Sequence, residues 1–180
     1  MSSPAESERK SQHSLRDYQR QLAERTSLAT KSRAVLNRQL GFLAAGRGWL
    51  IDLGDASEIM PAPVITPVPG TQPWFVGLIN HRGRLTSVID FERFLGSPPL
   101  PPKTSDRLIV LSERFALSCS LRVATVNGLM DLPADITPSA ASLDRARWEG
   151  GGVQHQGRQW HRLALHELIA DPRFADAALR

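Results

Sequence analysis

Cysteine is almost absent from this chain of 180 residues, in which Cys119 is the only one. A single cysteine excludes a disulfide within the chain and fits a reducing cytoplasm. No apolar run is long enough to span a bilayer, and Met1–Ser14 contain no hydrophobic segment of the kind that directs secretion. These absences predict a globular cytoplasmic protein.

Motifs for catalysis are also missing. The clusters Gly46–Gly48 and Gly150–Gly152 lack the lysine and the serine or threonine that follow a phosphate-binding loop, so both are interpreted as hairpin turns. Cys119 alternates with leucines, a pattern typical of a small core residue and not of a nucleophile. We therefore expect a protein that is not an enzyme and that holds no cofactor.

Metal-ligating clusters are likewise missing. His155, His161 and His166 are spaced six and five residues apart, so no two of them share a helical face. No cysteine cluster accompanies these histidines, and the sequence predicts no metal site.

Basic charge is concentrated at the N-terminus. Residues 1–40 contain 8 Lys and Arg against 4 acidic residues, and the totals of 22 and 18 leave 14 of each sign in the rest of the chain. A nucleic-acid-binding domain usually has a basic face on the fold itself. A small β-barrel that binds nucleic acid through its basic N-terminal arm is therefore the alternative, weaker hypothesis.

The arm contains a predicted amphipathic helix from about Leu15 to Leu40, with Ser14 as its cap. Its apolar positions include Tyr18, Leu22 and Ala29. We favour packing of this helix against its own domain over docking to a partner or to an anionic membrane surface.

From Gly41 onward the sequence predicts many short strands separated by glycine and proline, which indicates a β-barrel or a β-sandwich. Two stretches rich in proline, Pro61–Pro73 and Ser97–Pro102, are expected to be extended loops. The expected organisation is an arm at 1–40, a domain at 41–170 and a tail at 171–180. Strands or hairpin strands are expected at 42–45, 49–53, 75–80, 85–91, 107–112, 115–126, around 148 and at 159–163, short helices at 92–95 and 165–169, and turns at 127–128 and 156–157.

The central feature is the predicted hairpin within Trp74–Gly96, whose turn is His81–Arg84. Asp90 in its second strand and Arg82 in its turn should each have a charged partner. Glu58 is the candidate partner of Arg82, because both flank the same proline loop. Such a pair either holds that loop closed or marks the edge of a protein-docking groove, and the two interpretations are compatible.

These residues resemble a known family. Glu58-Ile59, the proline loop, Pro73–Leu85 (PWFVGLINHRGRL) and Val88–Phe91 (VIDF) are similar to CheW-like domains, the scaffold adaptors of bacterial chemosensory arrays. The similarity continues in order through RLIVL, CSLRVATVNGL and GRQWHRLALHEL and covers roughly Gly41 to Ile169. The arm and the segments VPGTQPWFVG and LIADPRFADA are especially similar to adaptors of the pathway that controls type IV pili and twitching motility.

The resemblance implies two packed SH3-like β-barrels without enzymatic activity. Such adaptors connect the cytoplasmic tip of a chemoreceptor to the regulatory domain of a CheA-type histidine kinase, and they reach the membrane only indirectly, through receptor arrays. A receptor helix would lie in the groove between the barrels. By motif position, the implied receptor-facing residues are Ala56, Glu58, Ile59, Gly77, Ile79, Asn80 and Arg82.

The chain departs from the family pattern at three positions. Ala56 replaces a bulky β-branched residue, His81 replaces an apolar residue before the arginine, and Ala124 replaces an aspartate. These departures concern the choice of receptor and leave the expected fold unchanged. At Gly77, the missing side chain is expected to let a partner approach closely.

Overall fold

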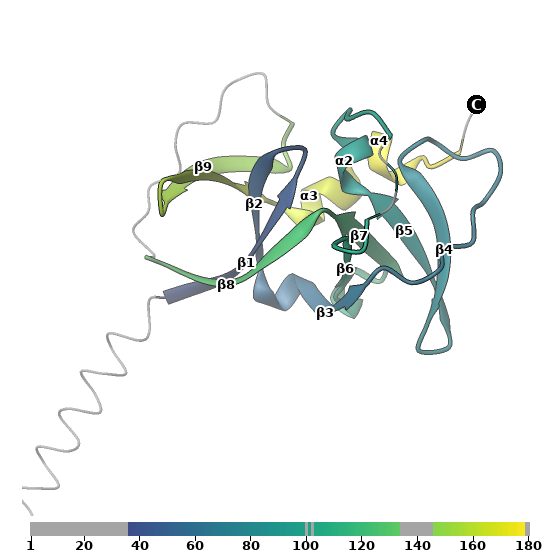
Figure 1. The fold of residues 1–180 in the computed structure, drawn as a ribbon, viewed down its shortest axis with the longest axis horizontal. Helices are drawn as coiled ribbons and strands as arrows, with labels where there is room; N and C mark the ends of the chain where they lie inside the picture. Colours follow the sequence, from purple (N-terminus) through teal and green to yellow (C-terminus); the bar gives the residue numbers. More distant parts are fainter. Residues whose placement is uncertain (1–35, 100, 102, 134–145, 179–180) are drawn as a thin grey trace, which may run out of the picture. The chain divides into compact units, whose positions relative to one another are not determined.

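The computed structural model describes residues 36–99, 101, 103–133 and 146–178. This part of the chain is mainly β and forms two five-stranded sheets (Figure 1). The mainly β class expected from the sequence is therefore confirmed.

The first sheet combines strands from both ends of the described chain. Its order is β8-β1-β2-β10-β9, with β2 and β10 parallel and the hairpin pairs β1–β2 and β9–β10 antiparallel. The strands are β1 (Leu36–Ala44), β2 (Arg47–Asp52), β8 (Thr125–Pro133), β9 (Glu149–His155) and β10 (Arg158–Leu163).

The second sheet is built from the middle of the chain. Its order is β3-β6-β7-β5-β4, in which β5 and β7 are parallel. The strands are β3 (Ala56–Pro61), β4 (Phe75–His81), β5 (Arg84–Asp90), β6 (Arg107–Leu111) and β7 (Cys119–Val123). Each sheet therefore brings together segments that are distant in sequence.

Short helices follow several strands. They are η1 (Leu53–Asp55), α2 (Phe91–Phe94), η2 (Glu113–Phe115), α3 (Leu165–Ala170) and α4 (Pro172–Ala175). Asp90 caps α2 by accepting a hydrogen bond from the Arg93 N–H at 3.1 Å. Asp171 caps α4 in the same way, from the Arg173 N–H at 2.9 Å. The helical segments predicted near 92–95 and 165–169 are confirmed.

One apolar core includes residues from both sheets and from the helices. Trp49 of β2 packs edge-on against Phe91 of α2, with ring centroids 5.3 Å apart, and lies 6.0 Å from Trp148. Helix α3, drawn in yellow near the centre of Figure 1, adds Leu165 and Leu168 to this core. The two sheets are therefore joined by shared side chains.

Three hairpins use the same type of turn. The pairs Ala45-Gly46, Arg82-Gly83 and Gln156-Gly157 all have positive φ at both positions. This is the turn that matches the twist of antiparallel strands, and glycine adopts it without steric cost at the second position. The predicted turns at His81–Arg84 and at Gln156-Gly157 are confirmed, whereas the turn expected at Gly46–Gly48 lies at Ala45-Gly46, because Arg47 and Gly48 belong to β2.

The segment after α3 packs against the rest of the structure. Phe174 of α4 is buried, and its ring stacks on that of Trp74 with centroids 6.0 Å apart. The Gln72 N–H donates to the Ala177 carbonyl at 2.8 Å. Residues 171–178 therefore cover the end of the proline loop.

Four expectations need correction or lie outside the description. The predicted helix from about Leu15 to Leu40 lies outside the described residues up to residue 35, and residues 36–40 belong to β1. The two barrels that the resemblance implies are not closed: among the described residues, no hydrogen-bonded pairing joins the first and last strand of either sheet. The structure therefore has two open sheets. Asn127-Gly128 and Gly150–Gly152 are not hairpin turns but lie within β8 and β9.

Candidate functional site

The candidate site lies where the two edges of the second sheet approach each other. Glu58 lies on β3 and Arg82 follows β4, although these strands are at opposite ends of the sheet order. Nη2 of Arg82 is 2.6 Å from Oε2 of Glu58, and Nε2 of His81 is 3.5 Å from the same oxygen. The sheet is therefore curled enough for an ion pair to connect its edges, and the predicted Glu58–Arg82 pair is present.

The turn does not itself need an arginine. Arg82 adopts a φ of 53°, and the equivalent turn position is occupied by Ala45 and Gln156 in the other two hairpins. Asn80 supports the turn, because its Oδ1 accepts a hydrogen bond from the Gly83 N–H at 2.9 Å. The identity of Arg82 is therefore explained by its charge and its exposure, since 76% of its side chain is accessible.

Gly77 admits the chain's own loop. Thr66 and Leu78 exchange two backbone hydrogen bonds of 2.9 and 2.8 Å, which fasten the proline loop to β4. A Cβ on Gly77 would lie 2.1 Å from the Thr66 carbonyl oxygen, and the φ of Gly77 is +144°. The close approach expected at Gly77 is therefore made by Thr66 within this structure.

The other implied receptor-facing residues differ in exposure. Ile59 is 42% exposed, and Asn80 is also on the surface. Ala56 is half-buried against the apolar core, and Ile79 is buried with Val88. Of the seven residues, Ile59, Asn80 and Arg82 are exposed, Ala56 and Glu58 are half-buried, and Gly77 and Ile79 are buried.

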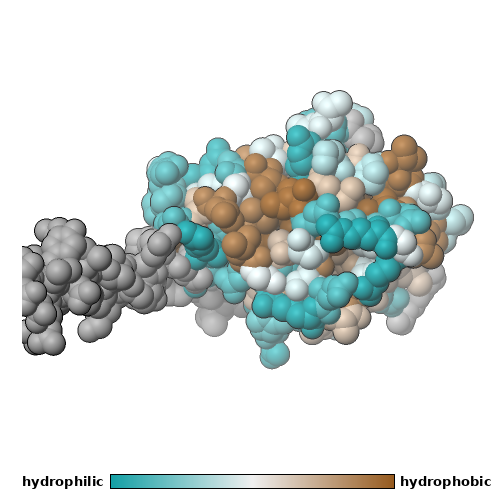
Figure 2. Space-filling model, turned by 90° about the horizontal axis from the view of Figure 1, so that it is seen from below, coloured by the Kyte–Doolittle hydropathy of each residue, from teal (hydrophilic) through white to brown (hydrophobic). Residues whose placement is uncertain are grey.

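A hollow of about 610 Å³ lies beside the Glu58–Arg82 pair. It is lined by the β4–β5 hairpin, the ends of β3 and β6, and the segment after η2. Its wall combines the charged residues Arg82, Arg84 and Glu113 with the apolar residues Leu111 and Leu117. Figure 2 shows the same mixture more widely, as apolar patches between hydrophilic residues on the face seen from below.

His81 was not among the predicted site residues, although the sequence marks it as a departure from the family. It lines the hollow and contacts Glu58. Its position directly before Arg82, at the end of a strand, is the signal that identifies it, because alternation along β4 places it on the inner side with Ile79.

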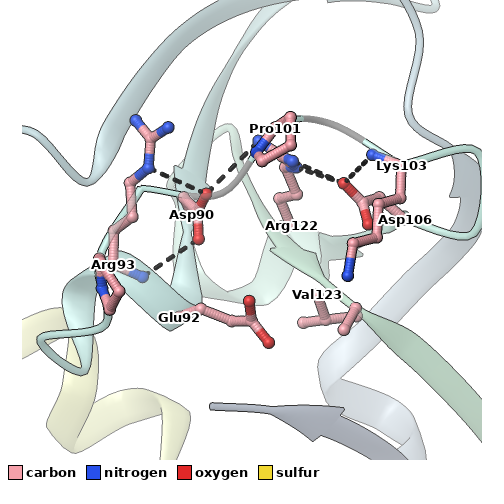
Figure 3. A pocket seen from close by; sticks show the side chains of 10 residues that line it. Asp90, Glu92, Arg93, Pro101, Lys103, Asp106, Arg122 and Val123 are labelled. Carbon is pink, nitrogen blue, oxygen red and sulfur yellow. Dashed lines mark hydrogen bonds and ion pairs between the residues drawn. The ribbon is translucent and has the colours of Figure 1, made fainter.

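A second polar cluster explains Asp90, the other charge that needed a partner. Figure 3 shows Arg122 of β7 between Asp90 and Asp106, with the two ion pairs at 3.4 and 2.5 Å. All three side chains are nearly inaccessible to solvent. The Lys103 N–H donates to Asp106 at 3.0 Å, and Arg93 lies 3.4 Å from Asp90. A pocket of only about 80 Å³ adjoins this cluster, so we assign it a structural role.

Cys119 has no features of a nucleophile. It is 2% exposed, and burial raises the pKa of its thiol to about 12. Its interpretation as a core residue is confirmed. Among the residues that the structure describes, no group of three or more metal-binding side chains comes together, and no helix is long and apolar enough to cross a membrane.

Comparison with known proteins identifies the family. The model of the CheW-like domain matches residues 38–173. The chain belongs to the CheW-like domain family. The resemblance expected from the sequence is therefore confirmed, and the family favours an adaptor over the alternative nucleic-acid-binding protein.

Several CheW-like proteins are similar over different lengths. Protein PilI from Pseudomonas aeruginosa is 30% identical over 145 residues, which make up 78% of this chain and 79% of PilI. Protein FrzA from Myxococcus xanthus is 35% identical over 106 residues, or 57% of this chain and 64% of FrzA. The crystal structure of scaffolding protein TtCheW from Thermoanaerobacter tengcongensis superposes with a TM-score of 0.66 at 21% identity and covers 77% of this chain and 95% of that one. The last comparison supports the fold, and the match to PilI agrees with the expected similarity to pilus-pathway adaptors.

Proposed function

We propose that this protein is a non-enzymatic adaptor that connects the cytoplasmic tip of a chemoreceptor to the regulatory domain of a CheA-type histidine kinase. Membership of the CheW-like family supports this role. The similarity to PilI favours a pathway that controls type IV pili and twitching motility, with chemotaxis as the related output. The protein would act in the cytoplasm and be recruited to receptor arrays at the membrane.

The observation that carries the proposal is the ion pair that connects the two edges of the second sheet. It combines an exposed cation, Arg82, with the partly exposed carboxylate of Glu58. The apolar residues beside this pair are Leu111 and Leu117 of the hollow, whereas Ile59, which is 42% exposed, alternates to the opposite face of β3 from Glu58. Apolar anchors beside charged groups are suited to binding an amphipathic helix in a groove. The proposed receptor-binding residues are Ala56, Glu58, Ile59, Gly77, Ile79, Asn80 and Arg82, of which Gly77 and Ile79 would act by shaping β4.

The direct test is a pull-down with a chemoreceptor signalling tip and a CheA-type regulatory domain from the same organism, each alone and both together. We expect a ternary complex in which this protein is required for retention of the kinase domain by the receptor tip. Failure of the folded protein to bind either cognate partner would contradict the proposal.

The Arg82→Glu variant tests the site itself. Reversing this charge places two carboxylates together, so binding of the receptor tip should weaken by about 10- to 100-fold, equivalent to about 1–3 kcal/mol. Isothermal titration calorimetry measures the affinity, and circular dichroism checks the fold. Arg158→Glu, an exposed position after the β9–β10 turn, is the matched control and should bind normally. Equal affinities for both variants would remove Arg82 from the site.

A further inference from the structure

We propose that His81 is a positioning residue of the receptor-binding site: it retains Glu58 when Arg82 turns to a carboxylate on the partner. This inference rests on the proposed function. Its starting point is that one oxygen of Glu58 has two nitrogen neighbours of very different exposure.

That oxygen is sensitive to the loss of a partner. Oε2 of Glu58 is buried and has no hydrogen bond of good geometry within the described part of the chain. Its two nitrogen neighbours are Nη2 of Arg82 at 2.6 Å and Nε2 of His81 at 3.5 Å. A buried carboxylate oxygen without a cation or a donor is costly, so the departure of Arg82 requires a replacement.

Arg82 is the neighbour that can leave. Its side chain is 76% exposed and extends from a turn, and ion pairs exposed to this degree contribute little to stability. His81 is 15% exposed and is held in β4 opposite Arg84. Because the His81 side chain is shorter and far less exposed than that of Arg82, it leaves less readily and remains beside Glu58. A movement of a few tenths of an ångström brings Nε2 within good hydrogen-bonding distance of the carboxylate.

The surrounding charges indicate what Arg82 would bind. Arg84, the other cation of the same wall, is paired with Glu113 at 2.6 Å. The exposed carboxylate of Glu113 is solvated, whereas Glu58 depends on His81 as its second neighbour when Arg82 leaves. With Glu58 retained by His81, Arg82 can turn to another anion, and a carboxylate on the bound segment is the chemistry that fits it.

A double-mutant cycle tests this arrangement without any partner. Arg82→Ala and His81→Leu should each lower the Tm by no more than about 2 °C, because Glu58 keeps one neighbour in each variant. The double variant should lose clearly more than the sum of the two changes. A Glu58→Gln background should abolish this excess.

A histidine distant from Glu58 provides the control for this cycle. His166 is exposed on α3, so His166→Leu combined with Arg82→Ala should give additive changes in Tm. Additive changes for His81→Leu with Arg82→Ala as well would overturn the proposal.

Binding of the receptor tip supplies the functional readout. His81→Leu should weaken binding by about 5- to 10-fold, and His81→Gln, which restores a side-chain N–H donor, should recover to within about 2-fold of the original affinity. Non-additive stability without any binding of the tip would disprove the proposed function and leave the Glu58–His81 contact established. Normal binding by His81→Leu would disprove the role of His81 and leave the adaptor function intact.

Discussion

At the scale of single residues, Arg122 carries a buried charge on which stability is expected to depend. It is the common partner of Asp90 and Asp106, and all three side chains are withdrawn from solvent. Removing the cation takes the shared ion-pair partner from two buried carboxylates, although Asp90 keeps Arg93 and Asp106 keeps the Lys103 N–H. This loss costs more than the loss of an exposed ion pair.

We therefore expect Arg122→Met to lower the free energy of unfolding by about 3–5 kcal/mol. Urea denaturation followed by tryptophan fluorescence measures this loss. Arg84→Met is the matched control, because the Arg84–Glu113 pair is exposed and should contribute about 0–1 kcal/mol. If the two variants lose the same stability, the buried cluster does not have the role assigned to it.

Asp90 and the Glu58–Arg82 pair show how much of the site can be predicted from the sequence. A charge in an apolar strand needs a partner, so Asp90 could be marked in advance, and the proline loop suggested the pairing of Glu58 with Arg82. Arg122 could not be identified as a partner of Asp90, because it reaches Asp90 only through the parallel pairing of β5 with β7. That pairing joins strands whose register depends on the packing of the whole sheet.

At the scale of elements, Gly77 controls how the proline loop attaches to β4. Gly77→Ala should destabilise the protein by about 2–4 kcal/mol, because the added methyl group meets the Thr66 backbone and the φ of +144° is unfavourable for alanine. Chemical denaturation measures the change in stability.

Gly83→Ala is the control for conformational strain alone. Gly83 has a φ of +81°, but a Cβ there would meet nothing within 4 Å. Its substitution should cost about 1 kcal/mol. A loss at Gly77 no greater than that at Gly83 would show that the loop moves freely away from β4.

We expect the contribution of Asp171, the cap of α4, to depend on pH. Hydrogen bonds from Arg173 to Asp171, followed by one from Trp148, lower the pKa of this carboxyl. A lowered folded-state pKa contributes stability above the unfolded value of about 3.9, and this stability is lost as the pH falls through the folded-state value. The Asp171→Asn variant should therefore lose less stability than the unmodified protein when the pH is lowered from about 5 to about 3. Thermal unfolding at each pH measures this difference. Parallel pH profiles for the two proteins would contradict the assignment.

Turns were predicted correctly at Arg82-Gly83 and Gln156-Gly157, where a residue followed by glycine joins two strands. They were predicted incorrectly where a glycine lies within a strand. Gly128 has a φ of +92° yet lies inside β8. Gly152 lies in β9, where a Cβ would be 2.2 Å from the Gln159 side chain. Locally, a glycine in a bulge or under a neighbouring side chain is indistinguishable from a glycine in a turn. The contacts that distinguish them come from other strands.

At the scale of the whole molecule, the shared core makes the two sheets depend on each other. Phe91 follows a strand of the second sheet and packs on Trp49 of the first. We expect a single unfolding transition, with far-ultraviolet circular dichroism and tryptophan fluorescence changing together. Phe91→Ala should lower the free energy of unfolding by about 3–5 kcal/mol and keep the transition single. Two separate transitions in either protein would show that the sheets are independent.

The order of the strands along the chain also has a consequence for synthesis. The chain makes β1 and β2, then every strand of the second sheet, and only afterwards β8, β9 and β10. On the ribosome, where N-terminal segments emerge first, the second sheet with its Glu58–Arg82 pair can assemble from one continuous stretch of nascent chain. The β1–β2 hairpin is marginally stable alone and must wait for β10 to cover the open edge of β2. The strands that hold the proposed receptor-binding residues are thus all synthesised before β8, β9 and β10, whereas the first strands to be made are among the last to find all their partners.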